Sequence, residues 1–61
     1  MSFERGQSVR LTDSGRREWP DIHGTGKIER VDTAERRVTV FWLIDGMESH
    51  VNLDFDHVEA A

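Results

Sequence analysis

The stretch that decides the fold is RVTVFWLIDGMESHVN, which spans residues 37–52. Most side chains of residues 37–44 are β-branched or aromatic and alternate between two faces, a pattern that predicts a β-strand. Asp45-Gly46 follows, and this dipeptide favours a two-residue type I′ turn, because both of its positions need a positive φ. Residues 47–52 then alternate as the return strand of a hairpin. The first strand is expected to point four side chains into the core: Val38, Val40, Trp42 and Ile44.

Three weaker strand signals lie outside this hairpin: alternation in residues 7–12, a second strand that Gly24-Thr25-Gly26 opens and that runs to residue 31, and a short final strand around Val58. In the second of these, Ile28 and Val31 are three residues apart, which breaks strict alternation. A bulge near residues 29–30 would turn both side chains inward.

Two connections carry turn chemistry rather than a periodic pattern. Residues 13–24 include Asp13-Ser14-Gly15, which favours a turn, and the only proline, so we expect a long first loop there. Residues 52–55 predict a short helical turn before the last strand, capped by Asn52 or Asp54. No stretch repeats apolar residues at helical spacing over three turns, which argues against a helix bundle.

Length and composition limit the class of protein. A chain of 61 residues is one domain at most, spanning residues 1–61. It has no cysteine, which excludes disulfides and thiolate zinc sites. No apolar run approaches the roughly 20 residues of a membrane helix, and the first residues lack the apolar core of a signal peptide. We therefore expect a soluble, cytoplasmic protein with no membrane partner.

Charge is distributed unevenly along the chain, whose formal net charge is −4. Residues 1–30 hold six Lys/Arg and five Asp/Glu, whereas residues 31–61 hold two and seven. A duplex-binding protein normally carries a broad basic face. The chain as a whole lacks such a face, although the charges of its first half still allow a local basic patch. The acidic residues of the second half have three alternative interpretations: a solvated face, a surface that meets a basic protein, or a mimic of nucleic acid. These residues are Asp45, Glu48, Asp54, Asp56 and Glu59.

The expected elements follow the order of an SH3-like barrel, with a long first loop, a tight hairpin and a short helical turn before the last strand. We therefore predict an all-β, five-stranded SH3-like barrel, whose closure would remove most exposed sheet edges. Residues 5–41 also resemble a KOW motif, which implies a unit that binds RNA or RNA polymerase, as in ribosomal proteins and transcription elongation factors. The matching residues are Gly6, Val9, Leu11, Gly24, Gly26, Ile28, Val31, Val38 and Val40.

A second resemblance covers more of the chain. Short uncharacterised bacterial proteins of similar length open with a comparable run of Phe, Gly, Val, Leu and Ser-Gly, and end on a Trp-containing strand and a glycine turn. The matching residues are Phe3, Gly6, Val9, Leu11, Ser14-Gly15, Val38, Val40, Trp42 and Asp45-Gly46. This resemblance implies a stand-alone bacterial protein and transfers no activity.

The first candidate binding surface is the expected loop and the strand after it. Arg16, Arg17 and Trp19 lie in the loop, and Lys27 and Arg30 lie on the strand. Arginine beside an exposed aromatic ring suits stacking on a base or holding a phosphate. The alternative is a solvated loop whose Trp19 covers one end of the barrel.

The second candidate surface is Phe41 with Leu43, which face outward if Trp42 faces the core. Apolar residues exposed together on a strand indicate a partner or a self-interface. The alternative is that the long loop or Phe3 covers them.

No catalytic residue, cofactor or metal is predicted, so we expect the protein not to be an enzyme. Cysteine and tyrosine are absent, and the serines lie in no nucleophile pattern. His23, His50 and His57 have aspartates nearby, but no pair has the spacing of a known metal site. The five aromatic residues are too few for a proline-peptide groove or a methyl-lysine cage.

These observations predict a small non-catalytic binding module, an accessory or regulatory barrel that interacts with a protein partner. Phe41 and Leu43 would supply the apolar contact, and the Arg16-Arg17-Trp19 loop would supply specificity. The alternative is a KOW-like module that binds RNA or RNA polymerase. We expect a monomer or a weak homodimer.

Overall fold

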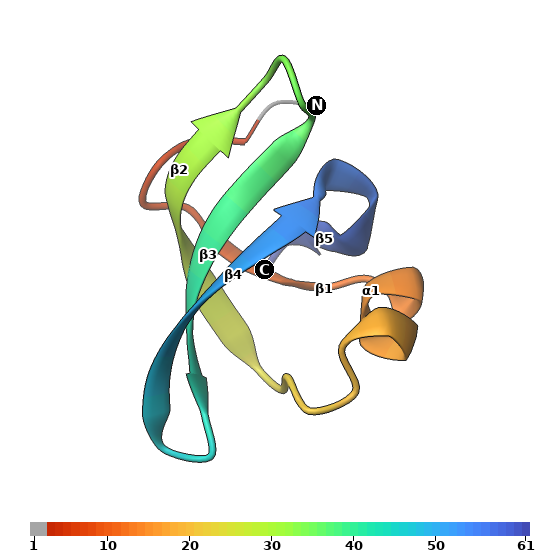
Figure 1. The fold of residues 1–61 in the computed structure, drawn as a ribbon, viewed down its shortest axis with the longest axis vertical. Coiled ribbons are helices and arrows are strands. Elements are labelled where there is room, and N and C mark those ends of the chain that lie inside the picture. The colour runs from red at the N-terminus through yellow and green to blue at the C-terminus, as the bar shows by residue number, and fades with distance from the viewer. Residues whose placement is uncertain (1–2) are drawn as a thin grey trace.

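A computed structural model describes residues 3–61 and contains one five-stranded antiparallel sheet in the order β4-β3-β2-β1-β5 (Figure 1). The all-β class is thereby confirmed. The sheet is open, with β4 and β5 as its edges, so the structure does not confirm a closed barrel. The strands are β1 (Ser8–Leu11), β2 (Thr25–Asp32), β3 (Arg37–Ile44), β4 (Met47–Asp54) and β5 (Val58–Ala60), and the helices are α1 (Asp13–Glu18) and the 3-10 helix η1 (Phe55–His57).

The β3–β4 hairpin forms as the sequence predicts. Its strands pair without interruption from Arg37 opposite Asp54 to Ile44 opposite Met47. Asp45 has φ of 53° and Gly46 has φ of 79°, which are the positive values that a type I′ turn requires. The tip of this hairpin projects at the lower left of Figure 1, away from α1 and η1 on the right.

Strand β2 contains the expected bulge. Its register with β3 shifts between Ile28 and Arg30. As a result Ile28 is buried, and Val31 is partly buried and packs against the same core. The extra residue, Glu29, keeps the apolar side chains on both sides of it directed inward.

The core lies on one face of the sheet, to which Val38, Val40 and Trp42 of β3 contribute buried side chains. Trp42 is 1% exposed, and its indole Nε1 donates a hydrogen bond of 3.0 Å to the carbonyl of His23. Ile22 is also buried, although the sequence offered no periodic signal for it. The buried apolar residues are Val9, Leu11, Ile22, Ile28, Val38, Val40, Trp42, Val51, Leu53 and Val58, with Phe3, Val31, Ile44 and Phe55 packed around them.

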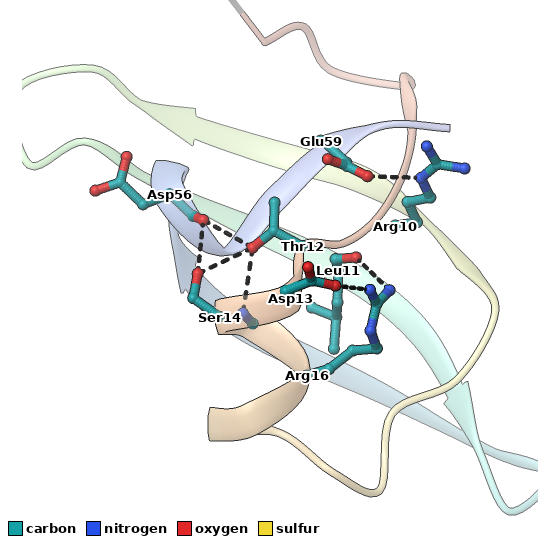
Figure 2. Close-up of polar contacts among 9 residues, drawn as sticks. Arg10, Leu11, Thr12, Asp13, Ser14, Arg16, Asp56 and Glu59 are labelled. Atoms are coloured by element: carbon teal, nitrogen blue, oxygen red, sulfur yellow. Dashed lines mark hydrogen bonds and ion pairs between the residues drawn. The ribbon is translucent and has the colours of Figure 1, made fainter.

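The prediction of a loop throughout residues 13–24 is wrong, because residues 13–18 form helix α1. The hydroxyl of Thr12 accepts a hydrogen bond from Gly15 N (3.2 Å) and donates one to the carbonyl of Asp56 (2.8 Å), as Figure 2 shows. Ser14 donates to the same carbonyl, at 3.2 Å. Gly15 is buried, and a Cβ there would lie 2.3 Å from the carbonyl oxygen of His57. These contacts with η1 stabilise α1. The helix is too short to show an apolar repeat in the sequence.

The predicted helical turn occurs, but later than residues 52–55. Asn52 and Asp54 remain in β4, since Asn52 pairs with Thr39 and the Asp54 carboxylate accepts a hydrogen bond of 3.2 Å from Arg37. Asp54 occupies the cap position of η1 without making a side-chain cap. Within residues 3–61, neither helix is long and apolar enough to cross a membrane.

Candidate binding surface on the outer face of the sheet

The outer face of the sheet brings four of the predicted site residues together. The strand register places Lys27 opposite Phe41, and Phe41 opposite His50 on the next strand. Directly opposed residues share one face of an antiparallel sheet, so these three side chains form a row. Arg30 and Leu43 lie on the same face, one on each side of this row along the strands. We call the following set the outer-face site: Arg5, Lys27, Arg30, Phe41, Leu43 and His50.

Phe41 lies at the centre of the outer-face site. Its ring is half-buried and packs edge-on against the imidazole of His50, with a centroid distance of 5.7 Å and an interplanar angle of 67°. A hollow of about 580 Å³ lies on one side of it, and its charged lining residues are Arg5, Lys27, Glu29 and Arg30. A second hollow of about 410 Å³ is lined in part by Trp42 and Leu43. Phe41 and Lys27 line both hollows, so a ligand in either one contacts the same ring.

Within residues 3–61, Arg5, Lys27 and Arg30 of the outer-face site make no ion pair, whereas His50 pairs with Glu29. The ion pairs among residues 3–61 use Arg10, Arg16, Arg37 and His50. Glu29, the carboxylate nearest in sequence to Lys27 and Arg30, lies 2.6 Å from Nδ1 of His50 instead. The charges of Arg5, Lys27 and Arg30 are therefore free to meet an anionic group on a ligand.

Arg5 joins this site through a contact that the sequence did not reveal. Gly6 has φ of 87°, and its N–H donates a hydrogen bond of 2.7 Å to the carbonyl of Ile28. Ile28 N in turn donates to the carbonyl of Gln7, at 3.0 Å. This pairing lays residues 5–7 against β2 and places Arg5 beside its hollow. Only the glycine hinted at such a turn.

The structure places Arg16, Arg17 and Trp19 apart from the outer-face site, and none of them lines its two hollows. Arg16 is engaged within its own segment, where Nη1 donates to the carbonyl of Leu11 (3.0 Å) and Nη2 pairs with Asp13 (Figure 2). Arg17 is exposed on α1, and Trp19 caps the C-terminal end of that helix with 40% of its surface exposed.

The histidines lie in separate environments. His50 pairs with Glu29, and His23 contributes its carbonyl to the bond with Trp42. Within the described part of the chain, no three His, Asp or Glu side chains gather closely enough to hold a metal ion. No protein-family model matches this chain.

Proposed function

We propose that this protein is a non-catalytic binding module whose outer-face site holds a protein partner. The observation that carries the proposal is the position of Phe41 between two hollows, with Leu43 beside it at 59% exposure. An aromatic ring flanked by concave surface is the kind of anchor point at which interfaces concentrate their binding energy. Fully burying an exposed side chain of this size contributes about 1.5–3 kcal/mol. Because Phe41 is already half-buried, a partner gains the part of this free energy that belongs to its exposed surface.

The three unpaired cations give this surface its selectivity. Arg5, Lys27 and Arg30 would favour a partner segment that carries carboxylates beside the apolar residue that meets Phe41. Charges at the rim of an interface act mainly on the association rate and on partner choice rather than on affinity. We therefore expect an affinity that depends only weakly on salt and an association rate that falls as the salt concentration rises.

The proposal includes the finer fold assignment, an SH3-like unit with an open sheet. Its support is the order of elements: five antiparallel strands, a tight β3–β4 hairpin and a 3-10 helix immediately before β5. The resemblance of residues 5–41 to a KOW motif points the same way. Lys27 and Arg30 lie within that stretch, whereas Leu43 lies beyond it.

A second candidate function is binding of single-stranded RNA at the same surface. One observation favours it: a half-buried aromatic ring stands beside three cations without acidic partners. Stacking of a base on an aromatic side chain, next to cations that hold the phosphates, is the common mode of single-strand binding.

Salt dependence separates the two functions. Short mixed-sequence RNA would be titrated into 15N-labelled protein at 50 and 200 mM salt, with amide shifts recorded for every residue. Three phosphate contacts give a slope of about −2 in log K against log salt, which lowers the affinity by roughly 20-fold between these concentrations. Shifts at Lys27, Arg30 and Phe41 that weaken in this way would establish RNA binding. Unchanged spectra would exclude it.

The protein-binding proposal is tested by comparing variants in capture from cell lysate. The double substitution Phe41→Ser with Leu43→Ser removes the apolar contact. Arg16→Gln with Arg17→Gln changes α1 and its bond to Leu11, away from the outer-face site. A true partner is lost with the first variant and retained with the second, provided that both stay folded by circular dichroism. A partner set that is identical for wild type and the Phe41 and Leu43 variant would contradict the proposal.

A further inference from the structure

Strand β4 leaves one of its two edges unpaired. It lies at the margin of the sheet, and β3 is its only neighbouring strand among residues 3–61. In a hairpin with a two-residue turn, the residues beside the turn form a hydrogen-bonded pair, and residues then alternate between pointing their backbone groups toward the partner strand and away from it. Because Ile44 lies opposite Met47, the outward-pointing N–H and C=O groups belong to Glu48, His50, Asn52 and Asp54.

A hydrogen bond just beyond the hairpin supports this alternation. Phe55 N donates to the carbonyl of Arg36 at 3.0 Å, which makes residue 55 inward-pointing and residue 54 outward-pointing. The bonds formed outside the regular helices and strands of residues 3–61 include none to the backbone groups of the four outward residues. These groups are therefore open to a further strand.

The two edges of the sheet differ in length. Strand β5 has three residues, whereas β4 has eight. A long unpaired edge is a template onto which an extended peptide adds as a new strand, with main-chain hydrogen bonds that supply affinity. The edge of β4 is thus long enough to bind an added strand through several main-chain hydrogen bonds, whereas the edge of β5 is not.

The negative charge near this edge indicates which kind of peptide it would bind. From Val38 to Ala61 the chain has no Lys or Arg, while Asp45 and Glu48 lie at the hairpin tip and make no ion pair within residues 3–61. On the other face of the strand, Met47 is 71% exposed. We propose that β4 binds an extended basic peptide by strand addition, with Lys or Arg at alternate positions toward Glu48 and apolar residues between them.

A second copy of the chain fits this edge less well. In the register centred on Val51, two antiparallel β4 strands would bring Glu48 opposite Asp54 twice. Like charges placed directly opposite one another destabilise a strand pair. Each copy also carries a formal net charge of −4, which adds to the repulsion.

The test uses three synthetic peptides as long as β4: alternating Lys and Val, alternating Glu and Val, and the Lys and Val peptide methylated on the amide nitrogens that would face β4. Hydrogen exchange of each amide is followed by NMR. The Lys and Val peptide should slow exchange at Glu48, His50, Asn52 and Asp54 by about tenfold or more, since these amides become hydrogen-bonded. The other two peptides should have no such effect.

Equal protection by the methylated or the acidic peptide would overturn the proposal. So would protection of these amides that grows with protein concentration before any peptide is added, because it would identify a second copy as the occupant. Phe41→Ser should leave the effect intact, which separates this edge from the outer-face site.

A substitution in the strand gives an independent test. Asn52→Pro removes one outward N–H, and proline is tolerated at solvent-facing positions of edge strands. Asn52→Ala is the matched control, because it also loses the side-chain bond to Thr39 but keeps the N–H. The Pro variant should lose most of the response to the Lys and Val peptide, and the Ala variant should keep it. If Asn52→Pro does not fold, the methylated peptide decides the question.

Discussion

Gly26 lies so close to Trp42 that a Cβ on residue 26 would stand 2.7 Å from Cδ2 of the indole ring. The same Cβ would lie 2.6 Å from Cγ1 of Val40 and 2.7 Å from the carbonyl oxygen of Phe41. One of these neighbours is backbone and another is a fully buried ring, so neither can move aside readily. Glycine at this position allows β2 to pass directly over the largest core residue.

Gly26→Ala should therefore destabilise the protein. We expect the free energy of unfolding to fall by about 1–3 kcal/mol, because the added methyl group overpacks the core. Urea denaturation followed by tryptophan fluorescence measures the loss. Thr25→Ala, at the exposed neighbouring position, should change stability by no more than about 0.5 kcal/mol. Equal stability of the Gly26 variant and wild type would mean that β2 and β3 lie farther apart in solution.

The cap of α1 gives a second prediction. Thr12→Ala removes the oxygen that accepts from Gly15 N and the hydroxyl that donates to the carbonyl of Asp56. Loss of an N-cap lowers stability by about 1 kcal/mol, and up to about 2 kcal/mol in proteins. Thr12→Ser keeps both bonds and should stay within about 0.5 kcal/mol of wild type in thermal denaturation. If Ser and Ala are equally destabilising, the methyl group rather than the hydroxyl is the important part of Thr12.

The hairpin turn gives a third prediction. Gly46 has φ of 79°, and a Cβ added there would have no atom within 4 Å. An alanine at this position would therefore clash with nothing, and its only cost is the strain of a positive φ. Gly46→Ala should lower stability by about 1–2 kcal/mol, which is the penalty for the left-handed conformation in a residue with a Cβ. Asp45→Asn is the control, because asparagine also tolerates a positive φ. A stable Ala variant would indicate a different turn type.

The two basic clusters give a fourth prediction. Lys27→Gln with Arg30→Gln and Arg16→Gln with Arg17→Gln remove the same charge from different surfaces. If RNA binds at the outer-face site, the first pair should lower the salt slope of its binding by about 1.4, at about 0.7 per phosphate contact. The second pair should leave the slope unchanged. The reverse pattern would move the site to α1.

The local signals predicted much of the sheet. Strand β3 has the bounds that its alternation indicated, and Asp45-Gly46 forms the expected turn. The step from Ile28 to Val31 correctly indicated a bulge. Each of these features depends on residues that are near one another in the chain, which is why a sequence pattern can report them.

Helix α1 and the full outer-face site could not be predicted in this way. The helix is held by Thr12 and Ser14 against the carbonyl of Asp56, a contact between distant parts of the chain. Lys27, Arg30, Phe41 and Leu43 were predicted from the sequence as binding residues. The prediction, however, placed the two cations on one surface with Arg16 and Arg17. Arg5 reaches the site only through the pairing of Gly6 with Ile28, and no local pattern encodes that pairing.

The order in which the strands pair has a consequence for synthesis on the ribosome. Strand β1 is held between β2 and β5, with Val9 opposite Ala60 and Leu11 opposite Val58. The β3–β4 hairpin, whose contacts are local, can form as soon as its own residues leave the exit tunnel. The pairing of β1 with β5 forms later, because β5 is synthesised after the other four strands. Until then Val9 and Leu11 lack their final cover, so a nascent chain stalled before Val58 should be the species that chaperones and proteases recognise.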